Sequence, residues 1–370
     1  MNAIINLKAV GDIMLGDHPV CFGHGVRSVI ERHGFDFIKA GLGNALTDAD
    51  IVFGNLETVL SNNGLNPDLL ASAELRGRPE EVGELAAMGF NLINVANNHA
   101  LQHGILAFEE TVDNLVNSRI EVIGLADGQR CEVKRLNNNG VEILVLSYSQ
   151  RPEKYYKGKT IPYARVTDDV ILSHVKEIRK DSQSPIMLSL HWGEEYVNYP
   201  SRSQINFAHS LVDAGVSLLL GHHPHVLQGI EPYNNGVIVY SLGNFIFDKW
   251  QRNPRETVIF DCRLNQNGVV DYKLIPIMIS RHHQPEIASK KQGEKILKHL
   301  KKYSEALKKI EAGRDEFIDW DRRFPELAEK AYFKFRIQSY LYFILHIYKY
   351  KPVIVFGSFL RSLQRRLGLA

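Results

Sequence analysis

Short apolar runs alternate with amphipathic stretches over the first 280 residues of the chain. Five of the runs are predicted to be strands, at residues 7–10, 51–53, 92–96, 186–190 and 218–220. Apolar residues at helical spacing predict helices at residues 79–88, 105–117, 168–180 and 202–214. Because strands and helices alternate, the pattern predicts an α/β fold in which helices cover a parallel or mixed sheet.

Further strands are expected at residues 121–123, 141–147, 237–241, 257–264 and 269–279. The strands are denser after residue 235, and turn sequences lie at Asn234-Asn235-Gly236 and at Asn265–Gly268. This spacing predicts a second, more antiparallel sheet with hairpins. Ser201 is the expected N-cap and Gly215 the expected C-cap of the helix at 202–214.

The last part of the chain changes character, and we expect a domain boundary near residues 281–290. Residues 293–312 are rich in Lys and have apolar residues at helical spacing, and residues 331–362 are aromatic and aliphatic. We therefore divide the chain into a domain at residues 1–280 and a basic, aromatic-rich helical extension at residues 281–370.

Charge is distributed unevenly along the chain. The net charge is +2, from 44 Lys and Arg against 42 Asp and Glu. Residues 331–370 hold seven of the basic residues and no acid, so the first 330 residues carry 37 basic against 42 acidic side chains. No nucleic-acid partner is expected from this balance. A basic helical segment is more typical of contact with a membrane surface or a partner, or of a helix packed on the domain with its basic edge in water.

Composition is that of a soluble globular protein, with 44% hydrophobic and 23% charged residues. Three widely separated cysteines form neither a disulfide framework nor a zinc-finger pattern. Lys8 and Asp12 interrupt the N-terminal apolar stretch, which excludes a secretory signal pattern. The longest uncharged stretch of the tail, residues 337–348, is shorter than the roughly 20 residues of a spanning helix. A cytoplasmic location is expected, with peripheral contact to the inner membrane through residues 331–370.

Metal-capable side chains follow the apolar runs. Asp12 follows Gly11 after the first run, Glu57 follows the second, and Asn98 and His99 follow the third. Carboxylate and amide oxygens bind hard or borderline cations, and His titrates near neutral pH. Each residue alone also fits a plain structural role: Asp12 as a turn residue, Glu57 as a first-turn acid of a helix, and Asn98-His99 as an Asx turn.

The last two runs of the five deliver histidines. His191 follows residues 186–190, where a lone His is more often a satisfied core residue, and Gly221-His222-His223-Pro224-His225 follows residues 218–220. Pro224 favours an extended conformation at its predecessor, so His223 and His225 can project together. Ligand sites of open α/β sheets lie beyond the carboxyl ends of the strands. The joint pattern therefore predicts one polynuclear metal site.

These segments resemble a known family, the bacterial capsule-synthesis protein family CapA, whose members are linked to poly-γ-glutamate capsule biosynthesis. The resemblance covers roughly residues 5–250 in the order of the family. It rests on six motifs: Gly11-Asp12-Ile13-Met14, Asn55-Leu56-Glu57, Asn97-Asn98-His99, His191-Trp192-Gly193-Glu194, Gly221-His222-His223-Pro224-His225-Val226 and Tyr240-Ser241-Leu242-Gly243-Asn244-Phe245.

That family in turn resembles the calcineurin-like metallophosphoesterases. The resemblance implies a four-layer α/β/β/α sandwich of two mixed sheets and two divalent metal ions (Mn, Fe, Zn or Mg). It implies Asp12 on the first ion, Glu57 as a bridge, His225 returning to the first ion, and His99 as proton donor to the leaving group. The ligands that it implies for the second ion are Asn98, His191 and His223.

One position departs from the metallophosphoesterase pattern. Those proteins usually carry a His two positions after the first Asp, whereas this chain has Met14. Met is a poor ligand for Mn or Mg. The first ion would then be weaker, absent, or completed by Asp17 or water.

Two functions compete. The leading hypothesis is a metal-dependent, phosphoesterase-like hydrolase that acts on a phosphoester or an anionic polymer in capsule or extracellular polymer biosynthesis. The alternative is a non-catalytic accessory or polymer-binding protein of capsule assembly that retains a metal site.

Overall fold

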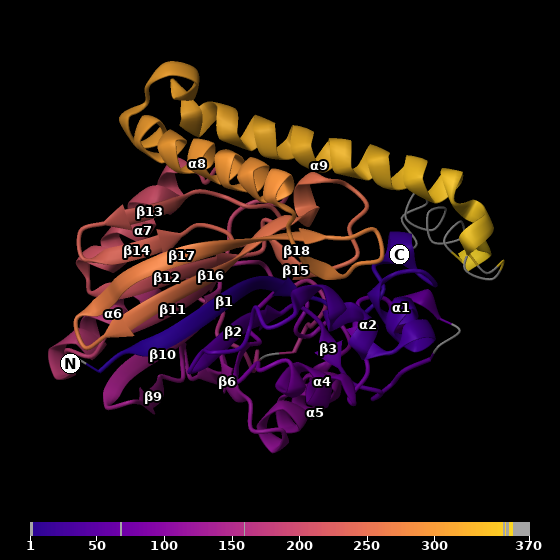
Figure 1. Cartoon of the computed structure of the whole chain (residues 1–370), viewed down its shortest axis with the longest axis horizontal. Coiled ribbons are helices and arrows are strands. Elements are labelled where there is room, and N and C mark those ends of the chain that lie inside the picture. Colours follow the sequence, from indigo (N-terminus) through magenta and orange to yellow (C-terminus); the bar gives the residue numbers. More distant parts are fainter. Residues whose placement is uncertain (1–2, 67–68, 159, 351, 353–354, 358–370) are drawn as a thin grey trace.

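Two mixed β-sheets stack face to face, and helices cover both outer faces (Figure 1). The computed structural model describes residues 3–66, 69–158, 160–350, 352 and 355–357. One apolar core lies between the sheets and includes Leu7 and Phe53 of the first sheet and Val145 and Leu218 of the second. A second core lies between the first sheet and its helices, and a third lies between the second sheet and its helices. The predicted four-layer α/β/β/α sandwich is confirmed.

The first sheet has eight strands. Five are parallel neighbours: β15 (Asn244–Ile246), β1 (Ile5–Ile13), β2 (Ile51–Leu56), β5 (Leu92–Asn94) and β6 (Glu121–Ile123). On the side of β1 away from β2, where β15 also pairs, the sheet continues antiparallel through β16 (Glu256–Asn265), β17 (Gly268–Ile279) and β18 (Pro285–Ile287).

The second sheet has six strands. Four are parallel neighbours: β14 (Gly236–Val239), β12 (Val216–His222), β11 (Ile186–His191) and β10 (Val141–Ser149). The edge strands β13 (Ile230–Tyr233) and β9 (Lys134–Asn138) run antiparallel. Short two-stranded pairs lie outside both sheets: β3 (Val59–Leu60) with β4 (Arg76–Gly77), and β7 (Ala126–Asp127) with β8 (Arg130–Cys131).

Helices bury their apolar stripes against the two outer faces. The first sheet is covered by α1 (Val26–His33), α2 (Phe35–Lys39), α4 (Glu81–Ala87) and α5 (Ile105–Asn117). The second is covered by α6 (Asp168–Asp181), α7 (Arg202–Asp213), the C-terminal half of α8 (Lys290–Ala312) and the first turns of α9 (Trp320–Leu345). The N-terminal half of α8 contributes Ile296 and Leu300 to the core between the sheets, where the helix contacts β17 and β13. Further helical segments among the described residues are α3 (Leu70–Ala73) and the 3₁₀ turns at Pro19–Cys21, Ala40–Leu42, Asn253–Arg255, Asp315–Phe317 and Ile347–Lys349.

One expectation about the sheets is wrong. The strands after residue 235 do not form a second, antiparallel sheet by themselves. The β16–β17 hairpin pairs with β1 and so joins the first sheet, whereas the β13–β14 hairpin pairs with β12 and joins the second. The turn signals gave both hairpins correctly, but local sequence carries no information about which distant strand each hairpin pairs with.

The predicted N-cap of α7 is confirmed, whereas its predicted C-cap is displaced by one residue. Ser201 caps α7 through a capping box, in which its side chain accepts from the backbone of Gln204 and the Gln204 side chain accepts from the backbone of Ser201. The C-cap of this helix is Ala214 rather than Gly215, which follows it at a φ of +113°. The helix expected at residues 79–88 begins later, at Glu81.

The described part of the C-terminal extension is largely helical, as predicted, while residues 358–370 of that predicted extension lie outside the described residues. Figure 1 shows α9 extending past α8 toward the side of the molecule where α1 lies. Ring contacts connect this end of α9 to two distant parts of the chain, because Tyr342 stacks on Trp250 and on His24. The division of the chain near residue 280 stays a prediction. Within the described ranges, no helix combines the length and the apolar character needed to cross a bilayer.

Candidate metal centre

Strand register brings the predicted site residues to one level. Asp12 of β1 is the partner of Asn55 in β2. In the second sheet, His191 of β11 is the partner of His222 in β12. The parallel strands of the two facing sheets therefore end at the same edge, where the ligand sites of parallel sheets lie.

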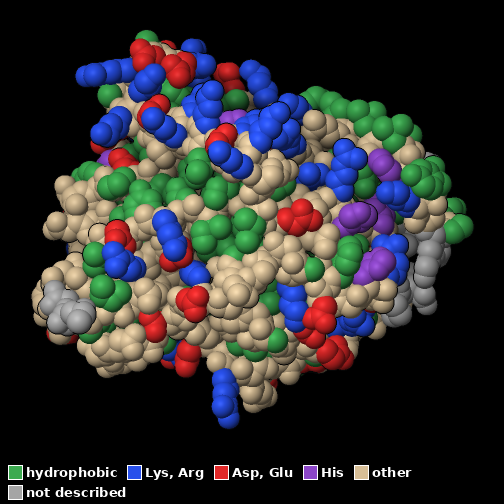
Figure 2. Space-filling model, in the orientation of Figure 1, with side chains coloured by type: hydrophobic (Ala, Val, Ile, Leu, Met, Phe, Trp, Pro, Cys, Tyr) green, Lys and Arg blue, Asp and Glu red, His purple; other side chains and the backbone are tan. Residues whose placement is uncertain are grey.

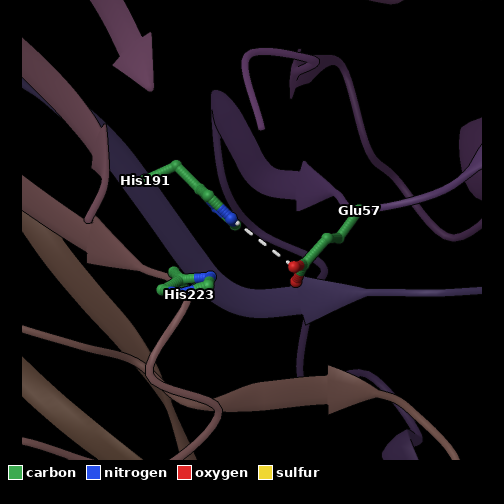
Figure 3. Close-up of side chains that lie close together, drawn as sticks. All are labelled: Glu57, His191 and His223. Atoms are coloured by element: carbon green, nitrogen blue, oxygen red, sulfur yellow. Dashed lines mark ion pairs between the residues drawn. The ribbon is translucent and has the colours of Figure 1, made fainter. Parts of the chain in front are cut away.

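Glu57 lies at the centre of this edge. Its Oε1 is 3.4 Å from His191 Nε2, 3.7 Å from His225 Nε2 and 3.9 Å from His99 Nε2. Figure 3 shows His191 and His223 directed toward the Glu57 carboxylate from the opposite sheet. Glu57 belongs to two sets of side chains whose ligand atoms lie within 4.8 Å of one another, one with His191 and His223 and one with Asp12 and His225. This arrangement places Glu57 where a bridge between two cations would lie.

The first of these sets also includes an amide. Asn98 Oδ1 lies 2.6 Å from His191 Nε2, and the His191 and His223 rings are 4.8 Å apart. Asn98, His191 and His223 are all buried. Two imidazoles, an amide oxygen and the carboxylate of Glu57 can together hold one cation.

The second set centres on Asp12. Asp12 Oδ2 lies 3.3 Å from His225 Nδ1, and its Oδ1 lies 3.3 Å from His222 Nδ1. Asn244 Oδ1 is 2.9 Å from His225 Nδ1, and the Asn244 amide donates to the His225 carbonyl. Because Asn244 fixes the ring through Nδ1, His225 Nε2 is left facing Glu57.

A buried amide network holds the carboxylates in place. Asn55 donates to Asp12 Oδ1 at 2.8 Å, and Asn94 donates to Asn55 Oδ1 at 2.7 Å. Ser147 of the second sheet donates to Asn94 at 2.6 Å, which links the two sheets below the site. Such outer hydrogen bonds orient metal ligands and limit their rotation.

Burial and neighbouring charges shift the pKa values of the site residues in different directions. Burial raises the pKa of Asp12, but hydrogen bonds and charge from His222 and His225 outweigh burial and hold this pKa well below its ordinary value. Burial raises the pKa of Glu57 well above its ordinary value. Burial lowers the pKa of His191 to about 3 and also lowers the pKa of His223 well below its ordinary range. Both histidines are therefore neutral at pH 7, the form that binds a metal.

Unsatisfied polar atoms show that the residues fit a metal group. Both carboxylate oxygens of Glu57 and both ring nitrogens of His223 are buried and have no hydrogen-bond partner among the described residues. A buried polar atom without a partner costs roughly 1–3 kcal/mol, and more when it is charged. Divalent cations would satisfy these atoms and stabilise the ionised form of Glu57.

Backbone conformation at the site is unusual. His223, His225 and Tyr196 all have positive φ values, of +95°, +58° and +64°. Side chains other than Gly avoid this region because Cβ crowds the backbone, at a cost of roughly 1–3 kcal/mol each. Strain of this kind is typical of functional sites, where it directs side chains that an ordinary turn would point elsewhere.

His99 lies at the rim of the site, with a side chain that is 15% exposed. Its Nδ1 is 2.7 Å from Gln102 Oε1, and this contact holds the ring with Nε2 facing Glu57. Burial lowers the pKa of His99 to about 4, so its ring is neutral at pH 7. The structure thus brings all seven predicted residues together, while their roles as ligands and proton donor stay predictions.

Neither Met14 nor Asp17 is positioned as a ligand. Met14 is fully buried in an apolar cluster with Leu75 and Phe247. Asp17 accepts hydrogen bonds from the backbone of Gly23 and Ser28, which places it beside α1. Asp17 therefore has a structural role beside this helix.

Three residues of the site were not singled out from the sequence as individual residues. His222 and Asn244 lie in motifs that the sequence marked. The contact of His222 with Asp12 depends on how the two sheets stack, and the position of Asn244 beside His225 depends on the pairing of β15 with the distant strand β1. Glu195 carries a carboxylate oxygen within 4.8 Å of ring nitrogens of both His223 and His225. The sequence signal for Glu195 was the Glu194-Glu195 pair, which places two carboxylates shortly after the candidate ligand His191.

Comparison with known proteins gives the family. Residues 6–249 match the family described as "Bacterial capsule synthesis protein PGA_cap". The chain is 30% identical to the PGA biosynthesis protein CapA of Bacillus subtilis, over 85% of this chain and 82% of that protein. It is 28% identical to the capsule biosynthesis protein CapA of Bacillus anthracis, over 81% of this chain and 74% of that protein.

A more distant relative is the probable polyglutamine synthesis accessory protein Rv0574c of Mycobacterium tuberculosis, 26% identical over 65% of this chain and 69% of that protein. Among solved structures, the 5'-nucleotidase precursor of Thermus thermophilus matches 83% of this chain and 59% of that chain, at 11% identity and a TM-score of 0.42. A TM-score of this size carries no weight for the family or the function of this chain. With residues 6–249 matched and the resemblance carried by the motifs of the metal centre, the chain belongs to the bacterial capsule synthesis protein family PGA_cap.

Proposed function

We propose that the protein is a metal-dependent, phosphoesterase-like hydrolase that acts in the biosynthesis of a capsule or of a related anionic polymer of the poly-γ-glutamate type. The observation that carries the proposal is the Glu57 carboxylate, which is buried, has no hydrogen-bond partner among the described residues and is shared by two ligand sets. The names of the relatives from Bacillus support the polymer context.

Two cations at this edge would be held by Asp12, Glu57 and His225 on one side and by Glu57, Asn98, His191 and His223 on the other. When bound, such a pair polarises a phosphoryl oxygen and lowers the pKa of water. Mn, Fe, Zn and Mg all remain candidates, because the mixed oxygen and imidazole ligands suit each of them.

His99 is the proposed proton-transfer residue. Gln102 fixes the ring so that Nε2 faces the space beside Glu57. A neutral ring can accept a proton there, whereas donation requires that the negative charge of a bound substrate raise the pKa of His99. General acid–base catalysis of this kind typically contributes about 10²–10⁴-fold to a rate.

The test is hydrolysis of generic phosphomonoesters and phosphodiesters by protein reconstituted with each of the four metals. We expect metal-dependent hydrolysis that Glu57→Gln abolishes. His99→Ala should lower turnover by about 10²–10⁴-fold while leaving the metal content unchanged, since His99 is not a proposed ligand. Metal-loaded wild-type protein that hydrolyses none of these substrates would contradict the proposal.

The second candidate is a non-catalytic accessory or polymer-binding protein that keeps a structural metal site. The accessory function in the name of the mycobacterial relative favours it. The comparison that separates the two is polymer production in a strain carrying His99→Ala beside a deletion strain. Production that persists with His99→Ala and is lost on deletion assigns the accessory function.

We also propose that α9 contacts an anionic membrane surface. Exposed apolar side chains recur on one face of this helix at positions 333, 337, 340, 341 and 344, and Phe333, Tyr340 and Ile344 are each more than half exposed. Figure 2 shows hydrophobic side chains gathered at this end of the molecule with Lys and Arg nearby. After residue 330 the α9 helix carries Lys334 and Arg336 and no acid, so the charge of this part of the helix complements anionic lipid headgroups.

A further inference from the structure

A third carboxylate faces the proposed cations. One carboxylate oxygen of Glu195 lies within 4.8 Å of ring nitrogens of both His223 and His225, and these ligand atoms also lie within 4.8 Å of each other. Glu195 follows His191 by four residues, in the loop after β11. The ligand sets described above do not use it.

A hydrogen-bond relay positions the Glu195 carboxylate. Lys249 Nζ donates to Tyr196 Oη at 3.2 Å, and the Tyr196 hydroxyl is in turn hydrogen-bonded to the Glu195 side chain. Lys249 is only 2% exposed, and its ammonium group lies 4.6 Å from the ring centre of Phe247.

Tyr196 contacts both α9 and the loop that carries His223 and His225. Phe335 of α9 stacks on the Tyr196 ring with centroids 4.2 Å apart. The Tyr196 backbone, at its positive φ, donates to the Pro224 carbonyl at 2.8 Å. Pro224 lies between His223 and His225, so the loop that carries Glu195 is fixed against the loop that carries both histidines.

The neighbouring acid provides a contrast. Glu194 has a half-exposed side chain and forms an ion pair with Arg151 at 3.0 Å. It belongs to none of the residue groups that could hold a metal ion in the described part of the chain. Two adjacent glutamates therefore have different environments, and only Glu195 is directed to the centre.

We propose that Glu195 is a further cation ligand, which completes the set formed by Asp12, Glu57 and His225. This inference rests on the proposed metal centre. Asn98 gives the other cation four protein ligands, whereas Asp12, Glu57 and His225 supply three. A carboxylate is a suitable fourth ligand for a hard or borderline cation. Tyr196 and Lys249 act as positioning residues.

The test is calorimetric titration of chelator-treated, full-length protein with Mn²⁺ alone, checked by elemental analysis. We expect wild-type protein to bind two Mn²⁺ per chain. Glu195→Gln should weaken Mn²⁺ binding at one of the two sites by about 100-fold. Loss of a residue that only supports a metal ligand lowers metal affinity by about 10- to 100-fold, and loss of a ligand should reach the upper end of this range. Tyr196→Phe keeps the stack on Phe335 and should weaken the same site by about 10-fold. Glu194→Gln is the matched control and should bind as the wild type does.

The possible results distinguish the proposed metal centre from the proposed role of Glu195 as a ligand. Wild-type protein that binds no Mn²⁺ contradicts the proposed metal centre and this inference with it. Two sites of wild-type affinity in a folded Glu195→Gln protein, checked by circular dichroism, overturn only the inference. Equal weakening of Mn²⁺ binding by Glu194→Gln and Glu195→Gln also overturns the inference, because the loss of affinity would then follow from the change in net charge and not from the loss of a ligand.

Discussion

Glu81 is a buried carboxylate outside the metal centre, and its protonation couples folding to pH. It accepts a hydrogen bond from the Arg78 backbone at 3.0 Å, yet burial raises its pKa to about 7. The folded protein therefore holds a proton that the unfolded chain releases near pH 4.5. The contribution of Glu81 to stability is fully present below about pH 4.5 and is lost as the pH rises through about 7.

We expect the Glu81→Gln variant to lack this dependence, because an amide does not titrate. The difference in free energy of unfolding between wild type and variant should fall by about 2–3 kcal/mol from pH 4.5 to pH 7.5, as measured by urea denaturation. The exposed neighbour Glu80 gives the control, Glu80→Gln, for which no such change is expected. If the difference in free energy of unfolding between wild type and Glu81→Gln stays constant over this pH range, the raised pKa of Glu81 is refuted.

The element that carries His222 depends on a glycine at its end. A Cβ at Gly221 of β12 would lie 2.0 Å from the Tyr240 carbonyl oxygen and 2.6 Å from Trp192 Nε1. Those two groups are hydrogen-bonded to each other at 3.0 Å. Gly221→Ala should therefore destabilise the protein by about 3 kcal/mol in thermal or urea unfolding.

Gly83 of α4 is the matched control. A Cβ there meets no heavy atom within 4 Å, and the position is exposed and helical. Gly83→Ala should stabilise the protein by roughly 0.5–1 kcal/mol, because it removes the entropy cost of Gly in a helix. Similar stabilities for the two alanine variants would show that β12 tolerates the side chain and that its packing is not as tight as described.

The outer face of α9 is the element for which membrane contact is proposed. We expect the wild-type protein to sediment with vesicles of phosphatidylglycerol and phosphatidylcholine. The double change Tyr340→Ser and Ile344→Ser should weaken this binding by at least about tenfold, because it removes two exposed apolar side chains without changing the charge.

The control for this experiment lies on α5, where Leu106 and Val116 are comparably exposed. Replacing both with Ser should leave vesicle binding unchanged. Wild-type protein that stays in the supernatant contradicts membrane contact. Equal sedimentation of wild type and the α9 variant also contradicts it, and so does concentration-dependent dimerisation through this face, which would assign the face to a second copy of the chain.

Over the whole molecule, the sequence predicted the residues of the site better than it predicted their contacts. Polar residues directly after apolar runs marked Asp12, Glu57 and His191 correctly as neighbours, because the ends of parallel strands meet at one edge. Which hairpin joins which sheet could not be predicted, since that depends on pairing between distant strands. For the same reason the contacts of Asn244 with His225, and of Glu195 with both histidine rings, were not foreseen.

The central claim is that segments from both sheets converge to hold two cations around Glu57. The most direct test is anomalous scattering from crystals of Mn²⁺-reconstituted protein, measured above and below the manganese edge. We predict two peaks roughly 3.5–4 Å apart, one on each side of the Glu57 carboxylate. Crystals that show no anomalous peak within reach of Glu57, at saturating Mn²⁺, would contradict the account.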